Sequence, residues 1–534
     1  MTMTPAAQAE GAPGFADARG CKEWLNALPL TNIPQAQSLV LETVRALNAA
    51  AFAPLERLKC MELLRDKVAF LQGEQRSRYF GKSLPLSPND SAAWTTGAAL
   101  LAAMEEGYRR SLAEAASSEL APHRALIAQR VARSIGTLML FHAIVYRRFD
   151  PEIWRRLHAL YGEAEAAGFA EERVKDSLEG DQDGSSSVAD AYVQVVLLQA
   201  AYLSEMTGAQ IDFAEALLKQ WLRKVRVMRA EEAPALELLP LVADLSSSIG
   251  ARPLPRAELK PVHRAFDVDQ VSRSLRKRIQ ALQSDEDPAK LGLPAQSAGL
   301  DLAAQLKRLH KLWCEGAPPR PPGKASELKI AGLVFTLPEV HFFASGGKLF
   351  EQPDKSRELT REEKQDIEVF GRVTERTQSR MLAEHNFSVE PWGVVEEMPG
   401  TWRLQRPPTA SKGVAIGRLV GVRLGETGTF FLGVIRALVQ ETDGRIVATV
   451  ALFPGKPEPI AVRAGDARNR SNAHWTQALR LPALERLQVP ASLVVPASMA
   501  VRGRGIEVWE GAPKESTVYE VLEHGADFDR VSMF

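Results

Sequence analysis

The hydrophobic pattern of this 534-residue chain changes its period once, and this change limits the folds that the chain can adopt. From about residue 20 to 315, apolar residues recur at three- and four-residue spacing, which is typical of amphipathic helices. After residue 390 they alternate with a period of two, which is typical of half-buried strands. We therefore predict an α+β multidomain protein with a helical N-terminal region and a β-rich C-terminal region.

The helical region is expected to span residues 20–314. It is rich in Ala, Leu, Glu and Arg, which lose little side-chain freedom in a helix, and its clearest periods lie at 127–145 and 214–228. No fixed repeat length is evident, so the expected architecture is a helical bundle or an irregular solenoid. The sequence predicts further helices at 36–50, 55–73, 92–115, 151–168, 188–206, 233–248 and 268–284.

Proline marks the boundary between the two regions. Residues 315–324, EGAPPRPPGK, hold four prolines in ten positions, a composition that favours an extended linker, here bounded at 315–327. Residues 328–390 are expected to hold one or two short connecting strands and then a charged helix with several arginines. Residues 391–534 are expected to form a small antiparallel β-barrel, because short strands alternate there with Gly and Pro breaks. Within it, Asp443-Gly444 indicates a tight hairpin.

Composition argues against several classes of protein. Lys and Arg total 66, as do Asp and Glu, so no global field draws the chain to nucleic acid or anionic lipid. The three cysteines and nine histidines show no metal-ligand spacing, which predicts a chain without a metal or other cofactor. Residues 1–19 are interpreted as a disordered tail, and the apolar runs are too short to cross a bilayer. We therefore expect a cytoplasmic protein.

Motifs for catalysis do not occur in the contexts that they require. The SGGK segment at 345–348 lacks the full spacing of a phosphate loop and the hydroxyl residue after the lysine. The DQDGS segment at 181–185 lacks the third oxygen ligand and the closing Glu of a calcium loop. We interpret both segments as turns and expect a protein that is not an enzyme.

Three arginines at four-residue spacing stand ahead of the predicted barrel: Arg372, Arg376 and Arg380. On a helix they would share a face, and in a looser segment they could fold around a ligand. Guanidinium groups bind phosphate bidentately and contact the O6/N7 edge of guanine, so this set suits a guanine nucleotide. The alternative is that the arginines pair with the acidic residues of 363–375 along a charged helix.

The arginines are followed by a predicted strand at 402–406 and by the turn Thr409-Ala-Ser411-Lys-Gly413. This order resembles PilZ-type domains, small β-barrels that bind cyclic di-GMP through an R-x-x-x-R segment ahead of the barrel and a [D/N]-x-S-x-x-G turn after the first strand. Further segments, at 416–423, 432–436, 452–455 and 461–463, follow this turn. With them the chain resembles a β-proteobacterial group of long proteins in which a helical N-terminal region precedes a divergent PilZ-like barrel.

The resemblance implies roles for particular residues. Arg372 and Arg376, or Arg376 and Arg380 in the alternative register, would contact phosphate and guanine. The hydroxyls of Ser411 and Thr409 and the tight turn at Gly413 would hold the other part of the ligand.

Two positions depart from the family pattern. Thr409 stands where the family has Asp or Asn, so one hydroxyl replaces a group that could address two donors of guanine. Val414 stands where the final glycine is expected, and a side chain there could obstruct the approach of the backbone to the ligand.

Our leading hypothesis is a non-enzymatic cyclic di-GMP receptor. Ligand binding would tie residues 372–380 to the turn at 409–413, and the helical region would relay the signal to a protein partner that the sequence does not identify. A second hypothesis is a degenerate PilZ-like scaffold that binds no nucleotide. A third, RNA binding on the barrel face, has less support, because Phe430, Phe431 and Phe453 are better placed for a core than for stacking on bases.

Overall fold

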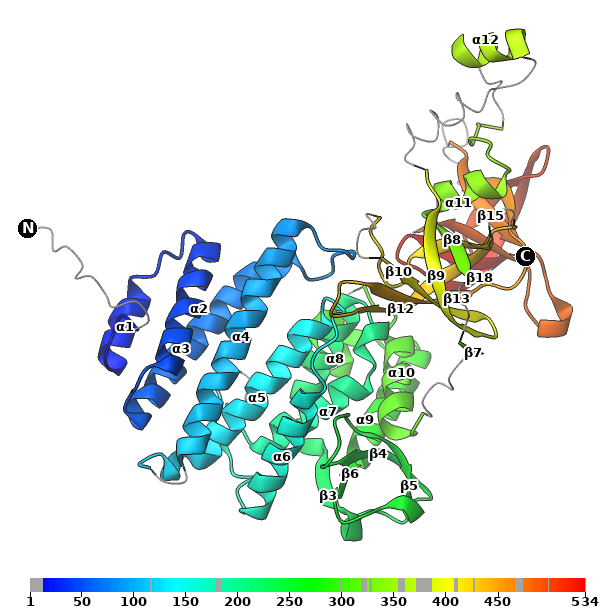
Figure 1. Cartoon of the computed structure of the whole chain (residues 1–534). Coiled ribbons are helices and arrows are strands. Elements are labelled where there is room, and N and C mark those ends of the chain that lie inside the picture. Colours follow the sequence, from blue (N-terminus) through cyan, green and yellow to red (C-terminus); the bar gives the residue numbers. More distant parts are fainter. Residues whose placement is uncertain are drawn as a thin grey trace, which may run out of the picture. The chain divides into compact units, whose positions relative to one another are not determined.

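The computed structural model describes residues 13–115, 118–178, 184–297, 299–317, 324–325, 329–353, 361–370, 387–407, 412–425, 428–465, 474–497 and 499–533. It divides the chain into two compact units. Unit 1 comprises Met1–Lys82 and Leu86–Arg320, and unit 2 comprises Ser83–Pro85 and Pro321–Phe534. The predicted order, a helical region followed by an antiparallel β-barrel, is confirmed, and the C-terminal part holds two barrels (Figure 1).

Unit 1 is a stack of helices around one hydrophobic core that runs from Phe15 to Trp313. Neighbouring helices such as α4 and α5, or α5 and α7, lie side by side, as expected for a bundle or an irregular solenoid (Figure 1). The described helices are α1 (Ala18–Asn26), α2 (Ile33–Ala49), α3 (Pro54–Gln75), α4 (Pro88–Ala115), α5 (Arg124–Ala143), α6 (Glu152–Ala166), α7 (Val188–Ala200), α8 (Gly208–Trp221), α9 (Asp269–Gln283) and α10 (Leu302–Cys314).

Local sequence explains where several of these helices begin. The Asp17 carboxylate accepts a hydrogen bond from the Gly20 N–H at 2.7 Å and caps α1. Capping boxes start α7, where Ser187 and Asp190 bond reciprocally, and α8, where Thr207 pairs with Gln210. Such caps satisfy the amide groups that have no partner in the first turn of a helix.

A four-stranded antiparallel sheet interrupts the helical region, and the helix predicted at 233–248 is wrong. The sheet has the order β3 (Arg226–Arg229), β6 (His263–Asp267), β4 (Leu238–Asp244) and β5 (Arg252–Pro255). Pro234 and Pro240 account for the difference, because proline lacks the N–H that a helix interior needs. The predicted helical period at 214–228 likewise stops at Trp221, where α8 ends, and Met228 is buried in the sheet instead.

The first barrel of unit 2 closes in the order β10-β13-β12-β11-β8-β9, with β9 pairing back to β10. Its strands are β8 (Ile330–Phe335), β9 (Glu390–Met398), β10 (Thr401–Arg406), β11 (Leu419–Leu424), β12 (Phe431–Gln440) and β13 (Ile446–Leu452), and β7 (Lys324–Ala325) pairs with β9. The hairpin predicted at Asp443-Gly444 is confirmed, since β12 and β13 pair antiparallel across it. Helix α12 (Arg361–Phe370) falls between β8 and β9 in the sequence, as do Arg372, Arg376 and Arg380. These arginines were predicted to precede the barrel, but in the sequence they follow its first strand, β8.

The second barrel is also closed and antiparallel, in the order β14-β15-β16-β19-β18-β17. Its strands are β14 (Glu458–Ala464), β15 (Thr476–Leu481), β16 (Ser492–Pro496), β17 (Gly505–Trp509), β18 (Pro513–His524) and β19 (Phe528–Met533). One apolar cluster joins both barrels to helix α11 (Leu337–Ala344), because Val340 of α11, Leu432 of β12 and Leu479 of β15 belong to it.

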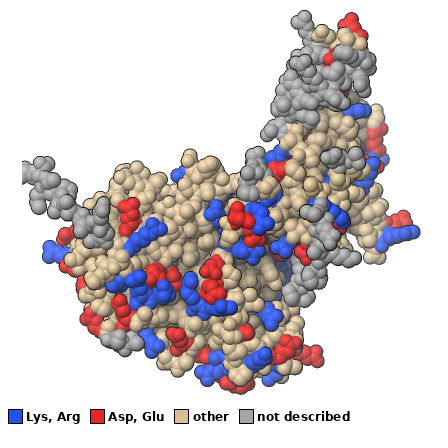
Figure 2. Space-filling model, in the orientation of Figure 1, with Lys and Arg blue, Asp and Glu red and all other residues tan. Residues whose placement is uncertain are grey.

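Two surface properties bear on function. No helix in the described part of the chain is long and apolar enough to cross a membrane. Basic and acidic side chains are interspersed over the face of unit 1 seen in Figure 2.

Of the three phenylalanines predicted to lie in a core, Phe430 and Phe453 are buried, whereas Phe431 is 41% exposed and the prediction for it is wrong.

Candidate functional site

The structure describes the surroundings of the predicted nucleotide site more fully than the site itself. Arg372, Arg376, Arg380, Thr409 and Ser411 lie outside the described residues, whereas Gly413 lies within them. The surroundings of the predicted site are therefore defined by the residues that flank it in the sequence. These are the chain at 387–389, which follows the arginines, and the turn at 412–418, which joins β10 to β11.

The backbone of the turn is held at three successive residues. The Lys412 carbonyl accepts a hydrogen bond from Arg406 at 2.8 Å, and the Gly413 carbonyl accepts one from Arg418 at 2.5 Å. Val414 and Leu84 exchange two backbone hydrogen bonds, each 2.8 Å long. Buried backbone groups need such partners, so the turn has a defined conformation before any ligand arrives.

Packing explains the residues found at 413 and 414. A Cβ atom on Gly413 would lie 3.0 Å from the Cβ of Ser83, so the close approach of that segment disfavours any side chain at 413. The Val414 side chain is fully buried. Its place in the core accounts for a valine where the family pattern has glycine.

Arg406 is a buried cation. The sequence pattern predicted only that it lies in a strand. Its side chain is 1% exposed and bonds Glu390 at 2.9 Å and the Leu84 carbonyl at 3.1 Å. The guanidinium also lies 5.3 Å from the centroid of the Trp392 ring. A buried charge must be paired, and Arg406 meets this need by joining β10, β9 and the segment at 83–85.

Glu339 of α11 connects the two segments that flank the predicted ligand. Its carboxylate accepts hydrogen bonds from the Lys412 ammonium in the turn and from the Ser388 N–H at 2.8 Å. The Lys412 ammonium also bonds the Ser388 carbonyl at 2.6 Å. The other Glu339 oxygen accepts the Phe335 N–H at 2.7 Å. Glu339 therefore fixes the chain that follows the arginines against the turn that follows β10.

Thr336, the residue before α11, has a φ of +73°, a value that β-branched residues rarely adopt. Such backbone strain costs about 1–3 kcal/mol and persists only when the surrounding contacts impose it. The hydrogen bond from the Phe335 N–H to Glu339 is one of those contacts, so the strained start of α11 and the Glu339 contacts form one unit.

A contact from the second barrel completes the support of the turn. Asp527 accepts the Leu419 N–H at 2.9 Å and lies 3.4 Å from the Arg418 guanidinium. Burial raises the pKa of Asp527 above its ordinary range, although these two partners oppose the rise. The Ala526 N–H also bonds the Gly417 carbonyl at 2.7 Å.

Six charged residues in and around the described turn form three pairs of opposite charge. Arg406 faces Glu390, Lys412 faces Glu339, and Arg418 faces Asp527. A ligand with two phosphates therefore meets no surplus positive charge from these six residues. The cations needed for such a ligand have to come from elsewhere, and the sequence offers the arginines at 372–380.

Comparison with known proteins identifies relatives for both units. The family model described as "Cyclic-di-GMP receptor FimW, N-terminal domain" matches residues 19–232. The Cyclic-di-GMP receptor FimW of Pseudomonas aeruginosa (strain PAO1) is 21% identical over 551 residues, an alignment that covers 92% of this chain and 86% of the relative. No solved structure matches. The similarity thus reaches from the helical unit into the unit that holds the barrels.

Proposed function

We propose that this chain is a non-enzymatic receptor for cyclic di-GMP. The observation that carries the proposal is the similarity of 92% of the chain to a protein named as a receptor for this nucleotide. Charge supports it as well. Two phosphates need positive groups, and the sequence supplies three arginines between β8 and β9, whereas the charges around the turn after β10 are balanced.

In the proposed complex the ligand joins two segments of unit 2. Arg372, Arg376 and Arg380 contact the phosphates and the guanine edge, since guanidinium groups suit both. Ser411 and Thr409 add hydroxyl contacts, and Gly413 keeps the turn close. The contacts of Glu339 with Ser388 and Lys412 support this arrangement, because they hold the ends of both segments together.

Binding would neutralise the arginine segment and fix its position against the turn. A change of this kind alters which surfaces of a protein are available to a partner. We propose that the helical unit relays the change to a partner protein and that the receptor works in the cytoplasm.

A scaffold that binds no nucleotide is the second candidate function. Gly413 favours it, because the approach of Ser83 accounts for a glycine at this position without any ligand. The replacement of the family Asp or Asn by Thr409 also favours it.

Calorimetric titration of the full-length protein with cyclic di-GMP separates the two candidates. We expect saturable binding that weakens at least about tenfold in Arg376→Ala, which corresponds to about 1.4 kcal/mol or more. Arg273→Ala is the matched control, since Arg273 lies on unit 1 and its side chain is 70% exposed. Cyclic di-AMP, which lacks the guanine O6 acceptor, should bind more weakly. Absence of binding by the unmodified protein would support the scaffold.

A further inference from the structure

A cleft in the helical unit has the features of a second ligand site, independent of the proposed nucleotide site. Its volume is about 330 Å³, it lies between α3, α4, α5 and α7, and Glu215 of α8 also lines it. Protein interiors leave few voids larger than a water molecule, and pockets for small molecules begin at roughly 300 Å³. The cleft is therefore large enough for a small organic ligand.

Gly73 of α3 is an exposed residue on the lining of this cleft, and close packing does not require a glycine there. A Cβ atom on the helical glycines Gly97, Gly107 and Gly136 would come within 2.8 Å of a neighbouring side chain, so close packing explains them. A Cβ atom on Gly73 would meet nothing within 4 Å, and Gly73 does not have a positive φ. Glycine weakens a helix relative to alanine, and at this exposed position of the lining the missing side chain leaves space that a ligand can occupy.

The walls of the cleft are mainly apolar. Helices α3, α4, α5 and α7 supply aliphatic and aromatic side chains that would bury an apolar ligand body. These residues include Val68, Leu101, Met104, Leu140, Phe141 and Leu198.

Arg65 of α3 and Arg76, which directly follows α3, lie on the same face of this helix, one before and one after Gly73 in the sequence. The Arg65 side chain is 11% exposed and pairs with Asp176, and the Arg76 side chain is 36% exposed and pairs with Asp212. The two arginines are eleven positions apart, which corresponds to about 16 Å along a helix axis. A guanidinium has five N–H donors, and a single carboxylate does not use all of them. Arg65 therefore keeps donors for an acidic group in a region with little solvent.

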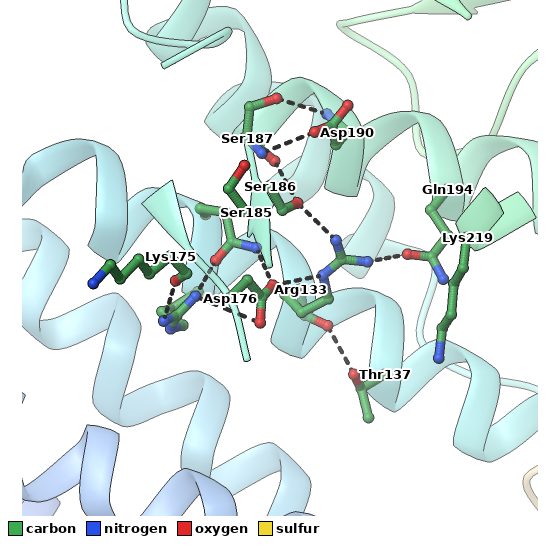
Figure 3. A network of polar contacts seen from close by, with 12 residues as sticks. Arg133, Thr137, Lys175, Asp176, Ser185, Ser186, Ser187, Asp190, Gln194 and Lys219 are labelled. Carbon is green, nitrogen blue, oxygen red and sulfur yellow. Dashed lines mark hydrogen bonds and ion pairs between the residues drawn. The ribbon is translucent and has the colours of Figure 1, made fainter. Parts of the chain in front are cut away.

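The Asp176 network holds Arg65 in place. Gln129 donates to the Asp176 carboxylate at 2.7 Å. The Arg133 guanidinium lies 3.6 Å from the same carboxylate (Figure 3). Burial is the largest influence on the pKa of Asp176 and raises it, but the guanidiniums of Arg65, Arg133 and Arg130 act in the opposite direction, and the pKa is lowered overall. Asp176 therefore remains an anion, and the guanidiniums around it are fixed before a ligand binds.

We propose that this cleft binds an amphipathic organic anion, with one acidic group on an apolar body up to about 16 Å long. Arg130 and Arg133 also line the cleft, but their guanidiniums bond Glu62 and Gln194, respectively. The acidic group pairs with Arg65, which is less exposed than Arg76, because a charge pair is stronger where water is scarce. The apolar body lies along α3 past Ala69 and Gly73 and covers the apolar wall of the cleft.

The test is calorimetric titration of the full-length protein with sodium dodecanoate below its micelle concentration. We expect saturable binding that weakens at least about tenfold in Arg65→Gln and becomes undetectable in Gly73→Leu. Leucine at 73 replaces glycine with a strong helix former in open space, so the unfolding temperature of Gly73→Leu should equal or exceed that of the unmodified protein. Arg273→Gln should bind dodecanoate normally.

Three outcomes would overturn the proposal: no binding of dodecanoate, equal binding by Gly73→Leu, or equal binding of the uncharged 1-dodecanol. Cyclic di-GMP titrated against Gly73→Leu separates the two sites. Unchanged nucleotide affinity together with lost dodecanoate affinity is the expected result. Loss of nucleotide affinity in Gly73→Leu would instead assign the cleft to the nucleotide and reject the amphipathic anion.

Discussion

The Glu339 carboxylate accepts the backbone N–H of Ser388 at 2.8 Å, although 49 residues separate the two in the sequence. The same carboxylate pairs with Lys412, which lies 73 residues from Glu339. Because Glu339 is only 3% exposed, these contacts act where water competes little for hydrogen bonds. The geometry of the proposed nucleotide site therefore depends on a residue in neither of its two segments.

Glu339→Gln tests this dependence. The amide keeps the shape of the side chain but loses the charge that Lys412 faces, so we expect lower stability by about 1–3 kcal/mol and cyclic di-GMP affinity weaker by about tenfold. Urea unfolding and calorimetric titration measure the two effects. Glu397→Gln is the control, since its partner Lys329 has a 56% exposed side chain. Nucleotide affinity that stays the same in Glu339→Gln would show that the site does not need this connection.

Gly413→Ala should destabilise unit 2. The added Cβ would lie 3.0 Å from the Ser83 Cβ, and we expect a loss of about 1–3 kcal/mol from this overpacking. Ser83→Gly removes the opposing atom, so the double variant should recover most of the loss. Additive effects in this double-mutant cycle would mean that Ser83 is not the reason for the glycine.

Local signals in the sequence predicted the β-rich part well. The strand expected at 402–406 corresponds to β10, and the hairpin expected at Asp443-Gly444 joins β12 and β13. The closure of two barrels depends on long-range pairing, such as that of β10 with both β9 and β13, which periodicity does not specify. The helix predicted at 233–248 is wrong, and Pro240 within it is a local signal against a helix.

The candidate site could be proposed from the sequence only where a motif lies within a short stretch of residues, and the binding roles of those residues stay predictions. Gly413 was found as part of such a motif, but its neighbour Ser83 belongs to a segment far away in the chain. Arg406 bonds the Leu84 carbonyl across 322 residues, and Glu339 stands in a short helix with no motif of its own. Contacts of this kind arise from tertiary folding and leave no spacing that a single sequence reveals.

Gly73→Ala should stabilise unit 1 by about 0.5–1 kcal/mol, because alanine is the better helix former and its Cβ meets no atom at this position. Gly107→Ala is the matched comparison. A Cβ on Gly107 would lie 2.5 Å from the Cε of Met61, which is fully buried, so we expect a loss of about 1–3 kcal/mol. Thermal unfolding of both variants checks the prediction, and a destabilised Gly73→Ala would contradict it.

Unit 1 should lose stability as the pH falls below about 6.5, the ordinary pKa of histidine, partly because of His158. This fully buried side chain bonds Tyr192 and the Ile249 carbonyl, each at 2.8 Å. Burial lowers the pKa of His158, more than the Ile249 carbonyl and Asp244 raise it. The unfolded chain then binds a proton that the folded chain excludes, so stability is present above the unfolded pKa and declines below it. Unfolding temperatures at pH 5.5 and 7.5 should differ less in His158→Gln than in the unmodified protein, whereas substitution of the exposed His474 by Gln should leave the difference unchanged. An equal pH dependence in His158→Gln would mean that other groups cause it.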